Sequence, residues 1–249
     1  MVRQRTELTV GGKSNTIVSA LVKTSVGWAD LFERVTLKAG QTITHQGMRP
    51  SFVYFPIDAV VSELVTPEGP EKTTNDMLVS MLGGEDVVGV QALLDTSPSP
   101  TTGFVEIGGS ALRCSAQAAR RFAEEHPAGR EILQAYLVLA QTESLQWLSF
   151  SLQRSVTDRL AAYLYWMREV AKEDTLPVTH RGISKKTGIR RPSLTEKAMP
   201  ALVQAGLVEQ VSDGRIDIKA PHRMGELMLE IWPLFGQHRQ AFRDALAIS

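Results

Sequence analysis

The sequence from Thr179 to Ala205 reads THRGISKKTGIRRPSLTEKAMPALVQA and predicts two short helices joined by a tight turn. Thr179 is a good N-cap for the first helix because its hydroxyl can accept a hydrogen bond from the first turn. Gly188 can adopt the left-handed conformation that ends that helix. Pro192 lies in the first turn of the second helix, where its missing N–H would have no intrahelical partner. Pro200 lies further inside that helix and is expected to bend it.

A short basic hairpin is expected after the two helices. Residues 208–218 contain Asp213-Gly214, and Asp-Gly tolerates the positive φ that tight turns need. Residues 179–223 carry nine basic and four acidic side chains, so their net charge is +5. The whole chain has 27 basic and 27 acidic residues, so the remainder carries −5. This asymmetry favours a winged helix-turn-helix whose basic groups neutralise phosphates on DNA.

Two arginines at the start of the second helix are the predicted base-reading residues. In a helix-turn-helix, the N-terminal residues of the second helix reach base edges in the major groove. Arg190 and Arg191 suit guanine O6 and N7, and Arg215 in the hairpin is expected to touch a phosphate. A solvated basic face on an ordinary pair of helices is the alternative interpretation, and the arginine pair together with the basic hairpin argues against it.

Residues 35–114 have the pattern of an all-β unit. Short apolar runs alternate there with turn residues, a spacing typical of a barrel or sandwich of about 80 residues. The runs are Thr42–Thr44, Phe52–Phe55, Val60–Val65, Met77–Met81, Val87–Val90 and Phe104–Ile107.

A long helix is predicted over residues 128–154, which contain no proline or glycine after Gly129. Such a helix is about 40 Å long, and an extended apolar face on it favours self-association. A helix packed wholly on its own domain is the alternative. The polar extension 1–27 has a short amphipathic stretch near residues 17–22, and a helical tail interrupted at Trp232-Pro233 begins near Met224.

These parts together resemble the CRP/FNR family of bacterial transcription regulators, from about Val35 to Ile218. Three stretches carry the resemblance: the β-rich region with Gly84-Glu85-Asp86-Val87-Val88-Gly89, the junction Arg154 to Ala161 after the long helix, and the winged helix-turn-helix from Leu176 to Ile218. The resemblance implies an α+β fold with a cyclic-nucleotide-binding-like β-barrel (jelly roll), a long dimerisation helix and a C-terminal winged helix-turn-helix. The expected division is an N-terminal extension (1–27), barrel (28–116), helical region (117–154), DNA-binding domain (155–222) and C-terminal tail (223–249).

The resemblance also implies roles for individual residues. Arg191 falls where the family places a base-reading arginine, and Glu196 falls at another base-reading position, where a glutamate could accept from cytosine N4. Pro192 replaces a glutamate found in many members, so the family's best-known half-site is not expected. The positions that usually hold phosphates are occupied by Thr179, Arg181, Arg190, Ser193 and Arg215, and Lys185 is expected to join them.

The ligand cassette of the cyclic-nucleotide-binding members is degenerate in this sequence. Val90, after Gly89, stands where the family has a glutamate for the ribose hydroxyl. Thr101, followed by Thr102, stands where it has an arginine for the cyclic phosphate. Burying a phosphate without a cation is costly, so binding of cyclic AMP or cyclic GMP in the usual way is not expected.

Other chemistries find little support in the sequence. Hydrophobic residues make up 43% and charged residues 22%, which excludes a disordered chain. Cys114 is the only cysteine, so four-cysteine zinc and iron–sulfur sites are excluded, and no histidine has a partner at metal-ligand spacing. No cofactor, metal site or catalytic motif is expected. No apolar run approaches the roughly 20 residues that span a bilayer. The single cysteine is typical of a reducing compartment, so a cytoplasmic protein is expected.

The expected function is that of a homodimeric, sequence-specific DNA-binding transcription regulator that recognises a pseudo-palindromic operator. RNA polymerase is a further candidate partner, and the sequence identifies no effector. Two alternatives stay open. One is an effector-binding module whose C-terminal helices contact protein and not DNA. The other is an enzyme that uses the barrel cavity, which would require convergent titratable groups that the sequence does not indicate.

Overall fold

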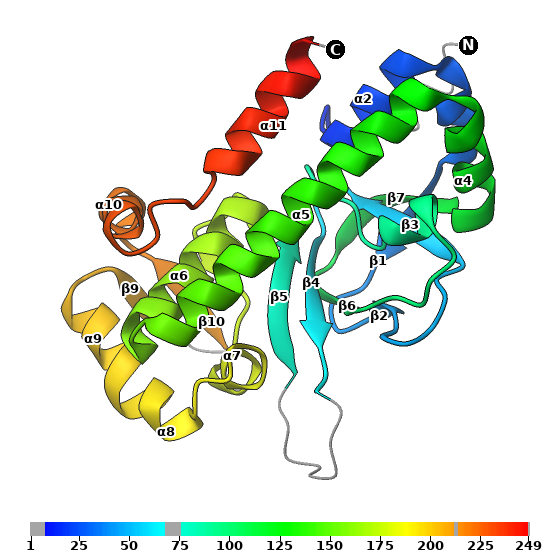
Figure 1. The fold of residues 1–249 in the computed structure, drawn as a ribbon. Helices are drawn as coiled ribbons and strands as arrows, with labels where there is room; N and C mark the ends of the chain where they lie inside the picture. Colours follow the sequence, from blue (N-terminus) through cyan, green and yellow to red (C-terminus); the bar gives the residue numbers. More distant parts are fainter. Residues whose placement is uncertain (1–7, 68–75, 212–213, 249) are drawn as a thin grey trace.

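The computed structural model describes residues 8–67, 76–211 and 214–248. The predicted turn residue Asp213 lies outside this set, and Gly214 lies within it. Figure 1 shows a long helix, α5 (Pro127–Gln153), with a β-rich part beside its N-terminal half and a smaller mixed part beside its C-terminal half. The last helix of the chain lies close to the β-rich part, so segments from both ends of the sequence meet there.

Two antiparallel sheets form the β-rich part. One has the order β1-β7-β3 and the other the order β2-β6-β4-β5. Small and branched side chains fill the space between them, among them Val61, Leu82, Val105 and Ala111. This arrangement, with the helices described below, confirms the predicted α+β fold with a jelly-roll barrel. The strands are β1 (Glu33–Leu37), β2 (Thr42–Thr44), β3 (Phe52–Pro56), β4 (Val60–Val65), β5 (Met77–Leu82), β6 (Thr102–Ile107) and β7 (Gly109–Ser115).

The strand predicted at Val87–Val90 is wrong. Val88 makes only an isolated bridge with Tyr54, and Gly89, with φ +80°, turns the chain into the short helix α3 (Gln91–Leu94). All three valines of the run are nevertheless buried. A buried turn and a buried strand both require apolar residues, so the composition of this run could not distinguish them.

The N-terminal extension is part of the core. Helix α2 (Thr16–Thr24) and the 3-10 helix η1 (Val26–Leu31) pack with α4 (Ala116–Glu125) and α5. Asn15 caps α2 through its side-chain oxygen, and its amide donates to the carbonyls of Pro56 (2.9 Å) and Asp86 (2.8 Å). The amphipathic stretch near residues 17–22 is therefore a helix that closes one side of the barrel.

The C-terminal part is a winged helix-turn-helix, as predicted. Its three-stranded sheet has the order β8-β10-β9, and its core contains Leu160, Ile183, Leu194 and Ile216. Strand β8 is the element that the sequence did not indicate. The elements are α6 (Val156–Ala171), β8 (Thr175–Leu176), α7 (His180–Thr187), α8 (Arg191–Ser193), the π turn η2 (Leu194–Ala198), α9 (Met199–Gln204), β9 (Val208–Val211) and β10 (Arg215–Ile218).

Pro200 interrupts the second helix of this motif, in the region where the sequence predicts a bend. Having no N–H, it cannot donate to the carbonyl of Glu196, four residues earlier. The chain forms a π turn just before it, in which the Met199 N–H bonds to the Leu194 carbonyl. The helix is thereby divided into α8, η2 and α9.

The C-terminal tail folds back to the barrel. Helix α10 (Pro221–Ile231) ends at Trp232, and α11 (Gln237–Ile248) then runs beside α5 (Figure 1). Leu246 is buried in the core shared by α2 and α5, and the Phe242 ring lies 6.0 Å from that of Tyr136. The tail therefore contacts both the winged helix-turn-helix and the barrel.

Candidate nucleic-acid interface

The turn between α7 and α8 has the geometry that the sequence predicts. The Thr179 hydroxyl accepts a hydrogen bond from the Gly182 N–H at 3.0 Å, which caps α7. Gly188, with φ +65°, ends that helix in the left-handed region. Ile189 is buried beneath the turn. These features fix the direction in which α8 leaves the turn.

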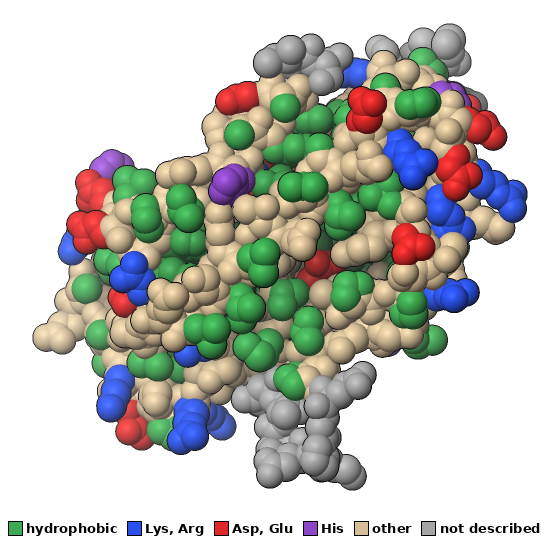
Figure 2. All heavy atoms as spheres, viewed as in Figure 1, with side chains coloured by type: hydrophobic (Ala, Val, Ile, Leu, Met, Phe, Trp, Pro, Cys, Tyr) green, Lys and Arg blue, Asp and Glu red, His purple; other side chains and the backbone are tan. Residues whose placement is uncertain are grey.

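Both predicted base-reading arginines are exposed at the start of α8. Arg190 is the residue before the helix, Arg191 is its first residue, and Glu196 is exposed one turn later. Figure 2 shows Lys and Arg side chains gathered at the end of the molecule where Figure 1 places α8. Because these side chains are exposed, they can reach a groove of DNA. Their roles in reading bases stay predictions.

The wing lies next to the start of α7. A Cβ on Gly214 would come within 2.8 Å of the Thr179 Cγ2, so the two predicted phosphate-contacting segments meet here. Arg181 and Arg215 are exposed beside them, while Ser193 is half-buried in α8. The structure thus brings Thr179, Arg181 and Arg215 together around α7 and the wing, while Ser193 lies apart in α8.

Lys185 is directed to the barrel. Its Nζ lies 2.9 Å from a carboxylate oxygen of Asp76, just before β5. Burial opposes ionisation of Asp76, but hydrogen bonds from Lys185 and Thr66 outweigh it and lower the pKa of this carboxyl. Lys185 would have to leave Asp76 to touch DNA, and its predicted phosphate contact stays a prediction.

A second ion pair between α7 and the barrel is buried. Lys186 pairs with Glu106 of β6, and their side chains are only 10% and 7% exposed. The Lys186 Nζ also lies 4.6 Å from the centre of the Phe104 ring. Local sequence patterns carry no sign of this contact, because the partners are 80 residues apart. It joins the winged helix-turn-helix to the barrel.

The degenerate ligand cassette contains no cation at the positions the family uses. Val90 is buried in an apolar cluster with Leu93, at the start of α3. Thr101 is buried, and the Thr102 hydroxyl accepts a hydrogen bond from the Gln46 N–H at 3.1 Å. These positions therefore have no side chain that could neutralise a bound phosphate.

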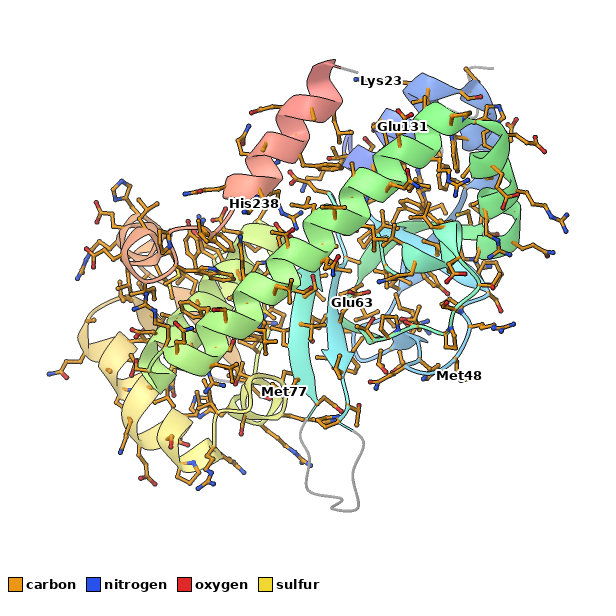
Figure 3. All side chains as sticks on the ribbon, in the orientation of Figure 1. Lys23, Met48, Glu63, Met77, Glu131 and His238 are labelled. Atoms are coloured by element: carbon orange, nitrogen blue, oxygen red, sulfur yellow. The ribbon has the colours of Figure 1, made fainter. Side chains whose placement is uncertain are left out.

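A carboxyl group lies beside the cassette, and it was missed from the sequence. Glu63 on β4 (Figure 3) is close to Thr101 and to the backbone of Gly89. Burial raises its pKa to about 7, the charge of Asp86 adds to the rise, and the nearby polar groups of Thr101 and Gly89 oppose it. A negative group here would repel a cyclic phosphate. The available signal was a lone glutamate within the apolar run Val60–Val65.

Glu63→Gln should stabilise the protein above neutral pH. The pKa of Glu63 is raised from 4.5 to about 7 in the folded protein. As the pH rises through this interval, the unfolded chain loses the proton first, so the free energy of unfolding falls. Glutamine removes this fall and should add roughly 3 kcal/mol at about pH 8, measured by urea unfolding at about pH 5 and about pH 8. Glu124→Gln, on the exposed face of α4, serves as the control and should change neither value. An unaltered pH dependence in Glu63→Gln would contradict the assignment.

Cys114 is an ordinary core residue. It is buried in β7, and burial raises the pKa of its thiol to about 12, so the reactive thiolate is disfavoured. Among the described residues, no three histidine, cysteine or carboxylate side chains gather as metal ligands. Nor does any helix in the described parts of the chain have the length and apolarity required to cross a bilayer.

Comparisons with known proteins identify the class of fold. No family model matches the chain. No curated protein matches it in sequence. Solved structures do match it over most of its length, and many of them are transcriptional regulators of the CRP/FNR family. The chain has the fold of these regulators, with a cyclic-nucleotide-binding-like β domain and a helix-turn-helix.

Three of these structures illustrate the likeness. FixK2 from Bradyrhizobium japonicum is 14% identical with a TM-score of 0.63, covering 79% of this chain and 97% of its own. A putative CRP/FNR regulator from Eubacterium rectale is 15% identical with a TM-score of 0.64, and the match covers 84% of this chain and 94% of that protein. A CRP/FNR regulator from Thermus thermophilus is 17% identical with a TM-score of 0.61, and the match covers 78% of this chain and 97% of that protein. At these identities the likeness concerns the fold.

Proposed function

We propose that the protein is a sequence-specific DNA-binding transcription regulator of the CRP/FNR type. The observation that carries this proposal is the pair of exposed arginines, Arg190 and Arg191, at the start of α8 in a winged helix-turn-helix. Arginines at that place suit guanine edges in the major groove, while Thr179, Arg181, Ser193 and Arg215 serve as phosphate contacts that fix the orientation. Regulators of this kind are not enzymes, and their work is done on DNA.

We further propose that two copies pair through α5. One face of this helix packs on its own chain through Leu133, Tyr136 and Trp147. On the other face, large apolar side chains recur at heptad spacing: Val138, Leu145, Leu148 and Leu152 are 64%, 59%, 42% and 75% exposed. Figure 2 shows hydrophobic side chains gathered along this face, over α5. A symmetric pair would present two copies of α8 to a pseudo-palindromic operator, with half-sites about one helical turn apart.

The barrel in this proposal is a sensor that does not use the family's phosphate cassette. Gly89, Val90, Thr101 and Thr102 lack a cation, and Glu63 adds a carboxyl next to them. Cyclic nucleotides are therefore not the proposed effectors. RNA polymerase is a candidate partner for a regulator of this type, and a cytoplasmic location follows from the proposed work on chromosomal DNA.

Arg191→Ala tests the proposed reading of DNA. An operator is first selected from a random DNA pool, and the affinities of the wild type and the variant are then measured on it and on its single-base variants. The variant should lose about 1–3 kcal/mol of binding free energy and relax specificity at one base pair of each half-site. Arg121→Ala, an exposed arginine on α4, is the matched control and should bind as the wild type does.

Salt dependence separates this function from the alternative of protein-binding helices. DNA affinity should fall steeply with salt concentration, because several phosphates release counterions when the basic face neutralises them. Selection that yields no common sequence, or an Arg191→Ala variant with unchanged base preference, would contradict the proposal.

A further inference from the structure

A cavity of about 420 Å³ lies where the barrel, α5, α6 and the C-terminal tail meet. Its walls include the Gly83–Asp86 loop of the barrel, Gln146 of α5, Trp166 of α6 and the tail from Trp232 to Arg243. This volume lies within the range of small-molecule sites. The cavity is separate from the degenerate cassette, since none of Gly89, Val90, Thr101 and Thr102 lines it.

The cavity has an aromatic wall. Trp166, Trp232 and Phe235 line it, and the Trp232 ring lies 5.7 Å from Trp166 and 4.9 Å from Phe235. The indole N–H of Trp232 is buried and has no hydrogen-bond partner among the described residues. Gln146, also on the lining, likewise makes no side-chain hydrogen bond within the described parts of the chain. Flat rings and free polar groups of this kind suit a planar organic ligand.

Negative charge is in excess around the cavity. Arg239 is shared between Asp86, at 2.7 Å, and Glu143, whose Oε1 lies 3.0 Å from the arginine Nε. Arg243 pairs with Glu85 at 2.6 Å. Three carboxylates thus face two guanidinium groups in this network. Over the whole described lining, six acidic side chains face four basic ones.

The distribution of these charges favours a cation over an anion. Both arginines already have carboxylate partners, so a bound anion would have to displace Asp86, Glu143 or Glu85. A cation would instead complement the surplus carboxylate and lie against the faces of the aromatic wall. Burial raises the pKa of Glu143, Arg239 opposes the rise and Asp86 adds to it, which is consistent with incomplete compensation.

We propose that this cavity binds a small organic cation that carries an aromatic ring. The ring would pack against Trp166 and Phe235, and the positive nitrogen would point to the carboxylates on the barrel and α5. The inference goes beyond the proposed function and does not rest on it, because binding requires no DNA. In a regulator, such a ligand would contact the barrel, α6 and the tail at once.

Calorimetry with three matched indoles tests the proposal on the full chain without DNA. Tryptamine is the cation, tryptophol is its neutral counterpart, and indole-3-acetate is the anion. Tryptamine should bind once per chain, at least about tenfold more tightly than tryptophol, and indole-3-acetate should bind most weakly. A wild type that gives no tryptamine binding up to about 5 mM, or that binds indole-3-acetate as tightly, would overturn the proposal.

Two variants locate the binding. Gln146→Trp fills the cavity and should weaken tryptamine binding at least about tenfold, whereas Gln117→Trp, exposed on α4 outside the cavity, should not. Glu173→Gln changes an exposed residue of the lining that has no ion pair with the described residues, so it should leave the fold intact. It should weaken tryptamine binding about twofold and leave tryptophol unchanged. Unchanged tryptamine affinity in both Gln146→Trp and Glu173→Gln would place the binding elsewhere and overturn the proposal.

Discussion

Replacing Lys186 by methionine should lower the free energy of unfolding by about 3–5 kcal/mol, as measured by urea unfolding near neutral pH. The Lys186 side chain is buried against Glu106, whose second carboxylate oxygen already has no hydrogen-bond partner among the described residues. Without the ammonium group, the Glu106 carboxylate would be left buried and uncompensated.

The neighbouring lysine provides a matched control. Lys185 also pairs with the barrel, but its side chain is 63% exposed, so Lys185→Met should cost less than about 1 kcal/mol. The double variant Lys186→Met with Glu106→Gln removes both charges and should recover most of the stability that Lys186→Met loses. Equal losses in the two single lysine variants would show that the buried pair does not hold α7 on the barrel.

Placing glutamates at Leu145 and Leu152 together should convert the proposed dimer into a monomer. Both side chains lie on the free face of α5, where two copies would bring four like charges into one apolar seam. Light scattering should then give the mass of one chain, 27.4 kDa. Operator affinity should fall at least roughly 100-fold, since the two half-sites would no longer be engaged by one linked molecule.

Leu229→Glu is the control for this pair of substitutions. Leu229 is 71% exposed, comparable to the α5 residues, but it lies on α10. This variant should keep the mass and the operator affinity of the wild type. A wild-type protein that is already monomeric at micromolar concentration, or a double variant that stays dimeric, would contradict the assignment of α5 as the pairing surface.

The winged helix-turn-helix was predictable because its signals are local. Thr179, Gly188 and Pro200 each act within one or two turns of the chain, and the structure gives each the conformation that its chemistry requires. The barrel was predictable from the spacing of apolar runs. The run at Val87–Val90 was misassigned because burial alone does not specify a strand.

Contacts between distant segments could not be predicted in the same way. Asn15 reaches Asp86, and Lys186 reaches Glu106, across 71 and 80 residues. Nothing in the local sequence of either partner identifies the other. The position of Glu63 beside the cassette depends likewise on the register of β4 with β6, and the cavity depends on the return of α11 to α5.

The return of α11 limits how the winged helix-turn-helix can move. The winged helix-turn-helix is joined to α5 at Arg154 and Ser155. After it, the C-terminal tail is bound to the barrel through the ion pairs of Arg239 with Asp86 and of Arg243 with Glu85. Rotation about the first connection must therefore either rupture the guanidinium contacts or bend the segment between Trp232 and Gly236. Helix α7 is also paired with the barrel through Lys185 and Lys186, so release of the tail alone would not free the winged helix-turn-helix. Reorientation of α8 would require these ion pairs and the tail contacts to be released together.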